Sequence, residues 1–278
     1  MTHPTVIKLH DGNLMPQLGL GVWKAGNEEV VSAIHKALEV GYRSFDTAAA
    51  YQNETGVGNA LRSAGVPRDE LFITTKLWND DQKRPREALQ ESLSKLQLDY
   101  VDLYLMHWPV PAIDHYVDAW KGMVELQKEG LVKSIGVCNF QIPHLQRLID
   151  ETGVAPVINQ IELHPFFPQT DALAYHAEHG ILTEEWSPLG RGNDLLRHPA
   201  ITGIARDTST NHQGERLIAL HTLTPEGTEQ TVPVDVLVVA LGVSPRLGPI
   251  ADWGLAMERK QLVVDTATFR TSMPGIYA

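Results

Sequence analysis

Apolar segments alternate with amphipathic helical segments through most of the first 190 residues of this 278-residue chain. The runs YRSFDTA (42–48), LFITTKLW (71–78) and VDLYLMHWP (101–109) are each followed by a stretch with the period of an amphipathic helix. Seven such strands can be counted, the last of them ILTEEWSPLG (181–190). Apolar strands that are separated by helices predict a parallel sheet whose faces are covered.

Seven successive β/α units without a reversal favour a closed (β/α)8 TIM barrel over an open sheet. A doubly wound sheet is the alternative, but no G-x-G-x-x-G follows the first strand, as a dinucleotide-binding turn there requires. Two short strands at residues 5–9 and 14–18, joined by His10-Asp11-Gly12-Asn13, predict an N-terminal β-hairpin before the barrel.

Charge and cysteine content narrow the class of protein. A net charge of −11 argues against nucleic acid or an acidic membrane surface as a partner, because both need a basic face. Cys138 is the single cysteine, so no intrachain disulfide is expected and a reducing compartment is favoured. The N-terminus has no signal-peptide pattern, and the apolar run VDVLVVALGV is too short to span a bilayer. We therefore expect a cytoplasmic protein, with no metal site indicated and a monomer favoured.

Three ionisable residues end successive predicted strands: Asp46 in SFDTA, Lys76 in FITTKLW and His107 in LYLMHWP. In a barrel these ends converge on one mouth, where catalytic groups lie. Tyr51 follows on the loop after Asp46. Each residue alone has an ordinary structural explanation, such as a loop cap, a solvent-reaching lysine, a core histidine or a packing tyrosine. All four at one mouth indicate a catalytic site.

Carbonyl reduction suits this set of residues. A phenol has a pKa of about 10 and donates its proton poorly near neutrality unless its anion is stabilised. We expect Lys76 to lower the pKa of Tyr51, Asp46 to keep the lysine charged, and His107 to orient the substrate oxygen. Because no side chain donates hydride, a nicotinamide cofactor is implied.

Residues 6–206 resemble the aldo-keto reductases, and among them the bacterial 2,5-diketo-D-gluconate reductases. The motifs GLGVW, GYRSFDTAAAYQNE, FITTKLWND, DLYLMHWP, KSIGVCNF, NQIELHP and EWSPLG match in order and spacing. The resemblance implies a (β/α)8 barrel closed below by a hairpin, NADPH as cofactor with NADH as the alternative, and an Asp-Tyr-Lys-His tetrad. The tetrad maps onto Asp46, Tyr51, Lys76 and His107.

The resemblance also assigns binding residues. It implies that the nicotinamide carboxamide is held by Asn139 and Gln160, with the ring of Trp186 stacked on the nicotinamide. The further cofactor-binding positions are Gly21, Val22, Trp23, Ser187 and Leu189. A substrate pocket is expected between Trp23, Trp78 and Trp108, although tryptophans at a barrel rim also pack loops.

The family pattern stops after Arg206, so we expect one domain of barrel units at 1–206 and an atypical tail at 207–278. The Lys-Ser element and arginine with which the family grips the adenosine 2′-phosphate are missing. RLIALHTL (216–223) and the extended run after a Pro-Glu-Gly-Thr turn predict a β-hairpin. This tail resembles a fragment of thioredoxin-reductase-like flavoproteins, including ferredoxin–NADP reductases. It lacks the glycine-rich flavin turn, so FAD is disfavoured.

A barrel with seven strands leaves backbone edges exposed. The spare apolar segment VDVLVVALG (234–242) has the length of a strand, and we expect it to fill the eighth position. Arg246 or Lys260 are candidates for phosphate binding, although no spacing supports either.

The sequence thus predicts an NADPH-dependent reductase of small carbonyl compounds such as keto-sugar acids, methylglyoxal or β-keto esters. The alternative is a catalytically impaired mosaic barrel that only binds a ligand or partner.

Overall fold

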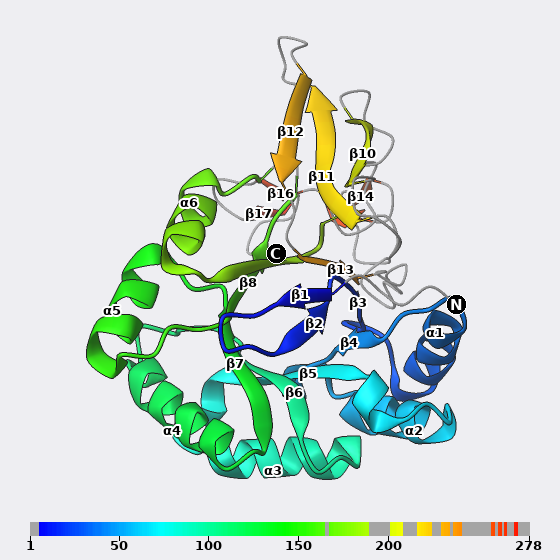
Figure 1. Ribbon diagram of the computed structural model, residues 1–278, viewed down its shortest axis with the longest axis vertical. Coiled ribbons are helices and arrows are strands. Elements are labelled where there is room, and N and C mark those ends of the chain that lie inside the picture. Colours follow the sequence, from blue (N-terminus) through cyan, green and yellow to red (C-terminus); the bar gives the residue numbers. More distant parts are fainter. Residues whose placement is uncertain are drawn as a thin grey trace. The chain divides into compact units, whose positions relative to one another are not determined.

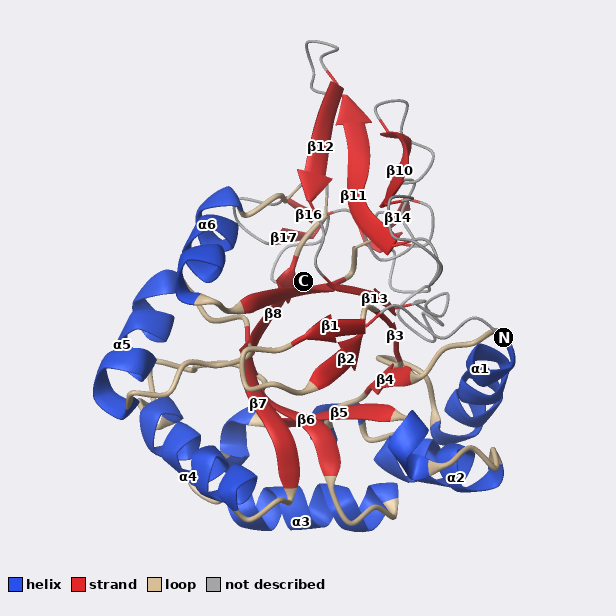
Figure 2. Cartoon of the chain, viewed as in Figure 1, coloured by secondary structure: helices blue, strands red, loops and turns tan. Residues whose placement is uncertain are grey.

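Eight parallel strands form a closed barrel in the computed structural model, in the order β13-β3-β4-β5-β6-β7-β8-β9. The structure describes residues 6–164 and 167–188 in full, and beyond them only the backbone of the strands between 201 and 271. The predicted TIM barrel is therefore confirmed. Figures 1 and 2 show the helices lying outside the ring of strands.

Helices connect consecutive barrel strands through β9. The barrel strands are β3 (Leu18–Gly21), β4 (Ser44–Asp46), β5 (Phe72–Leu77), β6 (Val101–Met106), β7 (Val132–Cys138), β8 (Ile158–Glu162), β9 (Leu182–Trp186) and β13 (Val236–Ala240). The helices are α1 (Asn27–Glu39), α2 (Glu54–Ser63), α3 (Pro85–Leu96), α4 (Tyr116–Lys128), α5 (Ile142–Thr152) and α6 (Thr170–His179), with short 3-10 helices η1 (Ala49–Tyr51), η2 (Arg68–Glu70) and η3 (Asn79–Asp81).

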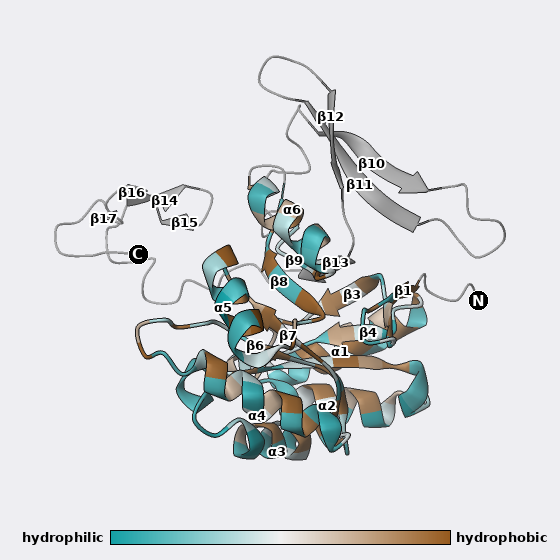
Figure 3. Ribbon diagram, turned by 60° about the vertical axis from the view of Figure 1, so that its left-hand side comes forward, coloured by the Kyte–Doolittle hydropathy of each residue, from teal (hydrophilic) through white to brown (hydrophobic). Residues whose placement is uncertain are grey.

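Local sequence signals explain where the helices begin and end. Helix α5 starts with a capping box between Gln141 and His144, has a proline in its first turn, and ends at Gly153 in the left-handed region with φ 70°. Its buried residues, Leu145 and Leu148, face the strands. Figure 3 shows hydrophobic and hydrophilic residues alternating along the helices, the pattern of elements that bury one face.

The barrel has two apolar cores. The larger one lies between strands and helices and includes Ile34, Phe45, Tyr104 and Trp120. The smaller one lies in the barrel interior beside the N-terminal hairpin. Its members are Leu9, Met15, Phe72, Leu103, Leu105, Cys138, Val157 and Ile158. Two of its members come from the N-terminal hairpin, so the hairpin closes one end of the barrel (Figure 2).

The predicted hairpin is confirmed. Strands β1 (Val6–Lys8) and β2 (Leu14–Pro16) pair antiparallel. Between them Gly12 adopts φ 95°, and the Asp11 side chain accepts a 3.1 Å hydrogen bond from the Asn13 peptide N–H. The Asn13 amide then donates to the Ser134 hydroxyl at 3.0 Å, which ties the turn to the base of β7.

The eighth barrel position is filled as expected from the tail. Strand β13 pairs parallel with β3 from Leu237↔Leu18 to Ala240↔Gly21. On its other side it pairs with β9, with Val236 opposite Glu184. Strand β13 (Val236–Ala240), from the predicted apolar segment, therefore closes the seam between the first and seventh barrel strands, and the barrel is closed.

Other tail strands are antiparallel. Strands β10 (Ile201–Asp207), β11 (Arg216–Leu223) and β12 (Glu229–Pro233) form a three-stranded sheet, so the hairpin predicted from RLIALHTL is confirmed. The chain divides into two compact units, 1–242 and 243–278. The second contains two short pairs, β14 (Met257–Glu258) with β15 (Gln261–Leu262) and β16 (Val264–Asp265) with β17 (Arg270–Thr271). The domain boundary at residue 206 stays a prediction.

Among the residues that the structure describes, no helix combines the length and apolarity that crossing a membrane requires.

Candidate active site

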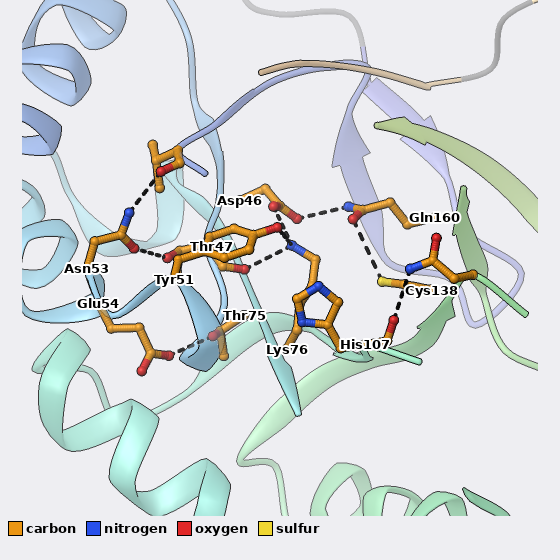
Figure 4. Close-up of polar contacts among 12 residues, drawn as sticks. Asp46, Thr47, Tyr51, Asn53, Glu54, Thr75, Lys76, His107, Cys138 and Gln160 are labelled. Carbon is orange, nitrogen blue, oxygen red and sulfur yellow. Dashed lines mark hydrogen bonds and ion pairs between the residues drawn. The ribbon is translucent and has the colours of Figure 1, made fainter. Parts of the chain in front are cut away.

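The four residues of the predicted tetrad converge at the C-terminal mouth of the barrel (Figure 4). Asp46 ends β4, Lys76 lies near the end of β5, His107 directly follows β6, and Tyr51 ends η1. Asp46 and Lys76 are buried, with 5% and 1% of their surface exposed. Parallel strands bring their ends together at one face, so residues 30 and 61 positions apart from Asp46 meet there.

Lys76 is the centre of the hydrogen-bond network. Its ammonium forms an ion pair with Asp46, donates to the Thr47 carbonyl oxygen at 3.0 Å, and lies 3.4 Å from the Tyr51 hydroxyl. The second carboxylate oxygen of Asp46 accepts a 2.9 Å hydrogen bond from the Gln160 amide. Both oxygens of the buried carboxylate therefore have partners, and the lysine is held within reach of the phenol.

A buried asparagine fixes the loop that carries Tyr51. The Asn53 amide donates to the carbonyl oxygens of Val22 at 2.8 Å and Ala25 at 3.0 Å, and its oxygen accepts from the Thr47 hydroxyl at 2.7 Å. These bonds join the ends of β3 and β4 to the residue that starts α2. The loop that carries Tyr51 is thus held between Thr47 on one side and the Asn53 contacts on the other.

Burial affects the pKa of Lys76 and the pKa of Tyr51 differently. Burial opposes the charge of Lys76, but Asp46 and Tyr51 outweigh it, so the lysine pKa is raised and the ammonium stays charged. Burial raises the pKa of Tyr51 to about 12, and Lys76 lowers it by less. Lys76 thus lowers the pKa of Tyr51 as expected, but desolvation of the phenolate is the larger effect, so the net pKa lies above the ordinary value.

His107 is neutral in this environment. Burial, and then the nearby Lys76 charge, lower its pKa to about 3. Its ring meets Tyr51 and Trp78 edge to face, with centroids 5.8 Å and 5.2 Å apart. Its buried Nδ1 has no hydrogen-bond partner among the described residues. A neutral imidazole carries one N–H, which it can donate to an oxygen in the mouth.

A cavity of about 650 Å³ opens above these groups. The predicted site residues that line it are Gly21, Trp23, Asp46, Tyr51, Trp78, His107, Trp108, Asn139, Gln160, Trp186 and Ser187. Val22 is not among the lining residues; it is buried in the larger core, and its peptide N–H donates to the Asp46 carbonyl oxygen at 3.0 Å. Leu189, Arg246 and Lys260 lie outside the described residues.

The cavity wall opposite Tyr51 is built from strand-end residues. The Asn139 amide donates to the His107 carbonyl oxygen at 3.0 Å, and its oxygen accepts from the Trp186 indole N–H at 2.9 Å. Asn139 and Ser187 adopt left-handed backbone conformations, with φ 61° and 56°. Such conformations are uncommon outside glycine and gather at functional sites. They turn the chain sharply as it leaves β7 and β9.

Two residues near the mouth, Asn53 and Glu184, were assigned no role from the sequence. Asn53 was visible only as part of the YQNE motif, without a role. Glu184 lies within β9 with 1% of its surface exposed, and a charged residue inside the apolar run ILTEEW was the signal that could have marked it. Within the described part of the chain no cluster of three potential metal ligands occurs.

Comparisons with known proteins agree with this geometry. The sequence model of the Aldo/keto reductase family matches residues 17–215. The methylglyoxal reductase DkgA of Salmonella typhimurium is 79% identical over 194 residues, which are 70% of this chain and 70% of that protein. An aldo/keto reductase structure from Brucella melitensis has 52% identity and a TM-score of 0.66, covering 69% of this chain and 75% of that one. A mutant of Gox0644 in complex with NADPH has 50% identity and a TM-score of 0.65, covering 68% and 69%.

Proposed function

The chain belongs to the aldo/keto reductase family, and from that premise we propose that it reduces small aldehydes and ketones to alcohols with NADPH. The observation that carries this proposal is the contact of the charged Lys76 with the hydroxyl group of Tyr51, a residue that lines an aromatic-walled cavity. A proton donor and its cationic neighbour then face the space where a carbonyl oxygen binds.

The cavity fits the nicotinamide end of the cofactor. Trp186 offers an aromatic face, and the amides of Asn139 and Gln160 line the same wall, where they match a planar carboxamide. When bound, NADPH supplies the hydride that the side chains lack. NADPH also occupies the related protein Gox0644. Because the 2′-phosphate grip of the family is missing from the sequence, the preference for NADPH over NADH needs its own measurement.

Tyr51 is the proton donor in this proposal. Its raised pKa keeps the phenol protonated throughout the neutral range. As negative charge develops on the substrate oxygen, the phenol O–H transfers its proton, and the phenolate that forms lies 3.4 Å from the Lys76 ammonium. Asp46 holds that ammonium in place and keeps it charged. The cost of a buried phenolate is thus offset during the transfer itself.

His107 orients the substrate. Its neutral ring packs against Tyr51 and can donate one N–H to the same carbonyl oxygen. Because the pKa of His107 is about 3, this donor stays in the same protonation state across the neutral range. Two donors directed at one oxygen fix the carbonyl relative to the nicotinamide.

Small substrates suit the aromatic wall formed by Trp23, Trp78 and Trp108. The 79% identity to a methylglyoxal reductase makes methylglyoxal the first substrate to test, with keto-sugar acids and β-keto esters next. The proposed partners are such carbonyl compounds alone, without nucleic acid, for a cytoplasmic monomer.

The test is NADPH oxidation by the purified full chain with methylglyoxal and with a keto-sugar acid, beside an NADH control. Turnover with NADPH that exceeds turnover with NADH supports the proposal.

An alternative is a barrel that binds NADPH without catalysis, because the family match ends at residue 215 and β13 comes from beyond it. Quenching of tryptophan fluorescence by NADPH, together with no turnover of either carbonyl compound, would favour this alternative.

A further inference from the structure

A second carboxyl group lies inside the barrel behind the tetrad. Glu184 is in β9, 1% exposed, and neither of its carboxyl oxygens has a hydrogen-bond partner among the described residues. It stands opposite Gln160 in the pairing of β8 with β9. The Gln160 amide donates to Asp46. Gln160 is therefore both the strand neighbour of Glu184 and a contact of the carboxylate that pairs with Lys76.

Among the described residues, the mouth supplies one buried cation for two buried carboxyl groups. Lys76 is the one lysine or arginine that is buried in the described part of the chain, and Asp46 already pairs with it. An ionised Glu184 would add a negative charge that has no counter-ion of its own, because the nearby Lys76 already pairs with Asp46. Buried charges without partners are costly, so the carboxyl group is expected to hold a proton instead.

The groups that face Glu184 come from four elements. Asp46 on β4, Lys76 on β5 and Cys138 on β7 interact with it electrostatically, and Gln160 on β8 is its strand neighbour. On the other side β13 consists of Val236–Ala240 and has no titratable residue in its sequence. Cys138 is itself buried, and burial raises the pKa of its thiol, so that side adds no charge near neutrality.

We propose that Glu184 is a positioning residue of the reductase: protonated at neutral pH, it leaves the Lys76 charge to Asp46 and Tyr51, and its ionisation at alkaline pH weakens proton donation by Tyr51. This inference rests on the proposed function. A single ammonium shared by two carboxylates stabilises a developing phenolate less well, because the added negative charge opposes it in a medium of low dielectric constant.

The titration range supports the proposal. Burial, and then the negative charge of Asp46, raise the pKa of Glu184 to about 8, while Lys76 and the Gln160 amide act in the opposite direction. The transition thus falls where reductase activity can be measured. Tyr51, with a pKa of about 12, titrates well above it, so the two ionisations are separable in a pH profile.

The experiment compares kcat/KM for methylglyoxal from pH 6 to about 10 in the full chain, Glu184→Gln and a control. Glutamine resembles the protonated acid, so the variant is expected to match the wild type at pH 6–7. The wild type is expected to lose activity as pH rises through about 8, and the variant to keep its plateau about one pH unit further. Glu184→Asp, which restores an ionisable group, brings the alkaline loss back.

Glu54→Gln is the matched control. Glu54 is equally buried, but it bonds to the Thr75 hydroxyl at 2.7 Å, away from the cavity wall. Its variant is expected to keep the alkaline loss of the wild type. An identical alkaline loss in Glu184→Gln would overturn the proposal and leave the proposed function standing.

A second measurement does not depend on activity. Carboxyl-labelled glutamate in the wild-type protein, followed by NMR, should show one group that titrates near pH 8 and is missing in Glu184→Gln. If no carboxyl group titrates between about pH 6.5 and 9, the proposal is overturned, whether or not the variant folds. Absence of turnover in the wild type, with this titration present, would instead reject the proposed function.

Discussion

Buried carboxylates at the two ends of the barrel differ in the number of cations beside them. At the closed end, Asp102 on β6 is matched by two cations, Arg68 at 2.7 Å and Lys133 at 2.9 Å, and accepts the Ile73 peptide N–H at 2.9 Å. At the mouth, Asp46 and Glu184 share one cation among the residues that the structure describes, Lys76. Charge is fully compensated where the hairpin closes the barrel and undercompensated where the cavity opens.

This difference suggests that the closed end serves the stability of the barrel, whereas the mouth serves proton transfer. At the closed end two cations and a peptide N–H hold the Asp102 carboxylate. At the mouth one ammonium serves a carboxylate and a phenol, so its charge can shift toward whichever group becomes negative. We therefore expect substitutions at the closed end to change only the free energy of unfolding, and those at the mouth to change turnover as well.

Lys76→Met should have the largest effect. It leaves Asp46 buried without its counter-ion, which costs about 3–5 kcal/mol of stability. It also removes the charge that stabilises the Tyr51 phenolate, so carbonyl reduction should fall by at least about 100-fold. Urea denaturation and NADPH oxidation measure the two losses.

Lys133→Met is the matched control at the closed end. Its side chain is 43% exposed and Arg68 remains beside Asp102, so the cost should be about 1 kcal/mol or less, with unchanged turnover. Equal losses of turnover in the two lysine variants would remove the distinction between the two ends.

Asp102→Asn should have an intermediate effect on stability alone. The amide oxygen can still accept the Ile73 N–H, but the two cations lose their shared anion, at a cost of about 2–3 kcal/mol. Because the residue lies at the strand end opposite to the cavity, kcat/KM at a temperature where the variant is folded should stay near the wild-type value. A large drop in kcat/KM would show that the ends are coupled.

His107→Gln should change stability only in acid. Since the pKa of His107 is about 3 in the folded chain and about 6.5 when unfolded, the unfolded state binds the extra proton between these values. Its stabilising contribution is present above pH 6.5 and is lost as pH falls, by ~2 kcal/mol at pH 5. The variant should therefore lose less stability than the wild type between pH 7 and pH 5 in urea denaturation. An equal loss would contradict the placement of a neutral histidine at the mouth.

The fold could largely be predicted from the alternation of apolar and amphipathic segments. Strands β3 to β9 follow from it directly, and so does the hairpin with Gly12. The segment at 234–242 was assigned to the eighth position from its composition and from the seam that seven strands leave. The boundary between the two compact units, after residue 242, had no comparable signal, because β13 belongs to the barrel while its flanking sequence resembles another family.

The sequence predicted which residues meet at the mouth of the barrel, but not their electrostatics. Strand-end positions identified Asp46, Lys76 and His107, because the barrel brings such positions together. The net pKa of Tyr51 could not be read from the sequence, since it depends on how deeply the phenol is buried. Glu184 was missed for the same reason: only the packed barrel shows that its carboxyl group faces inward without a counter-ion.

Carbonyl reduction by Tyr51→Phe tests the proposed chemistry most directly. The substitution removes only the hydroxyl group that lies 3.4 Å from the Lys76 ammonium. We predict a loss of methylglyoxal-dependent NADPH oxidation of at least about 100-fold, with NADPH still quenching tryptophan fluorescence and the unfolding midpoint unchanged. Wild-type turnover in this variant would contradict the role of Tyr51 as the proton donor.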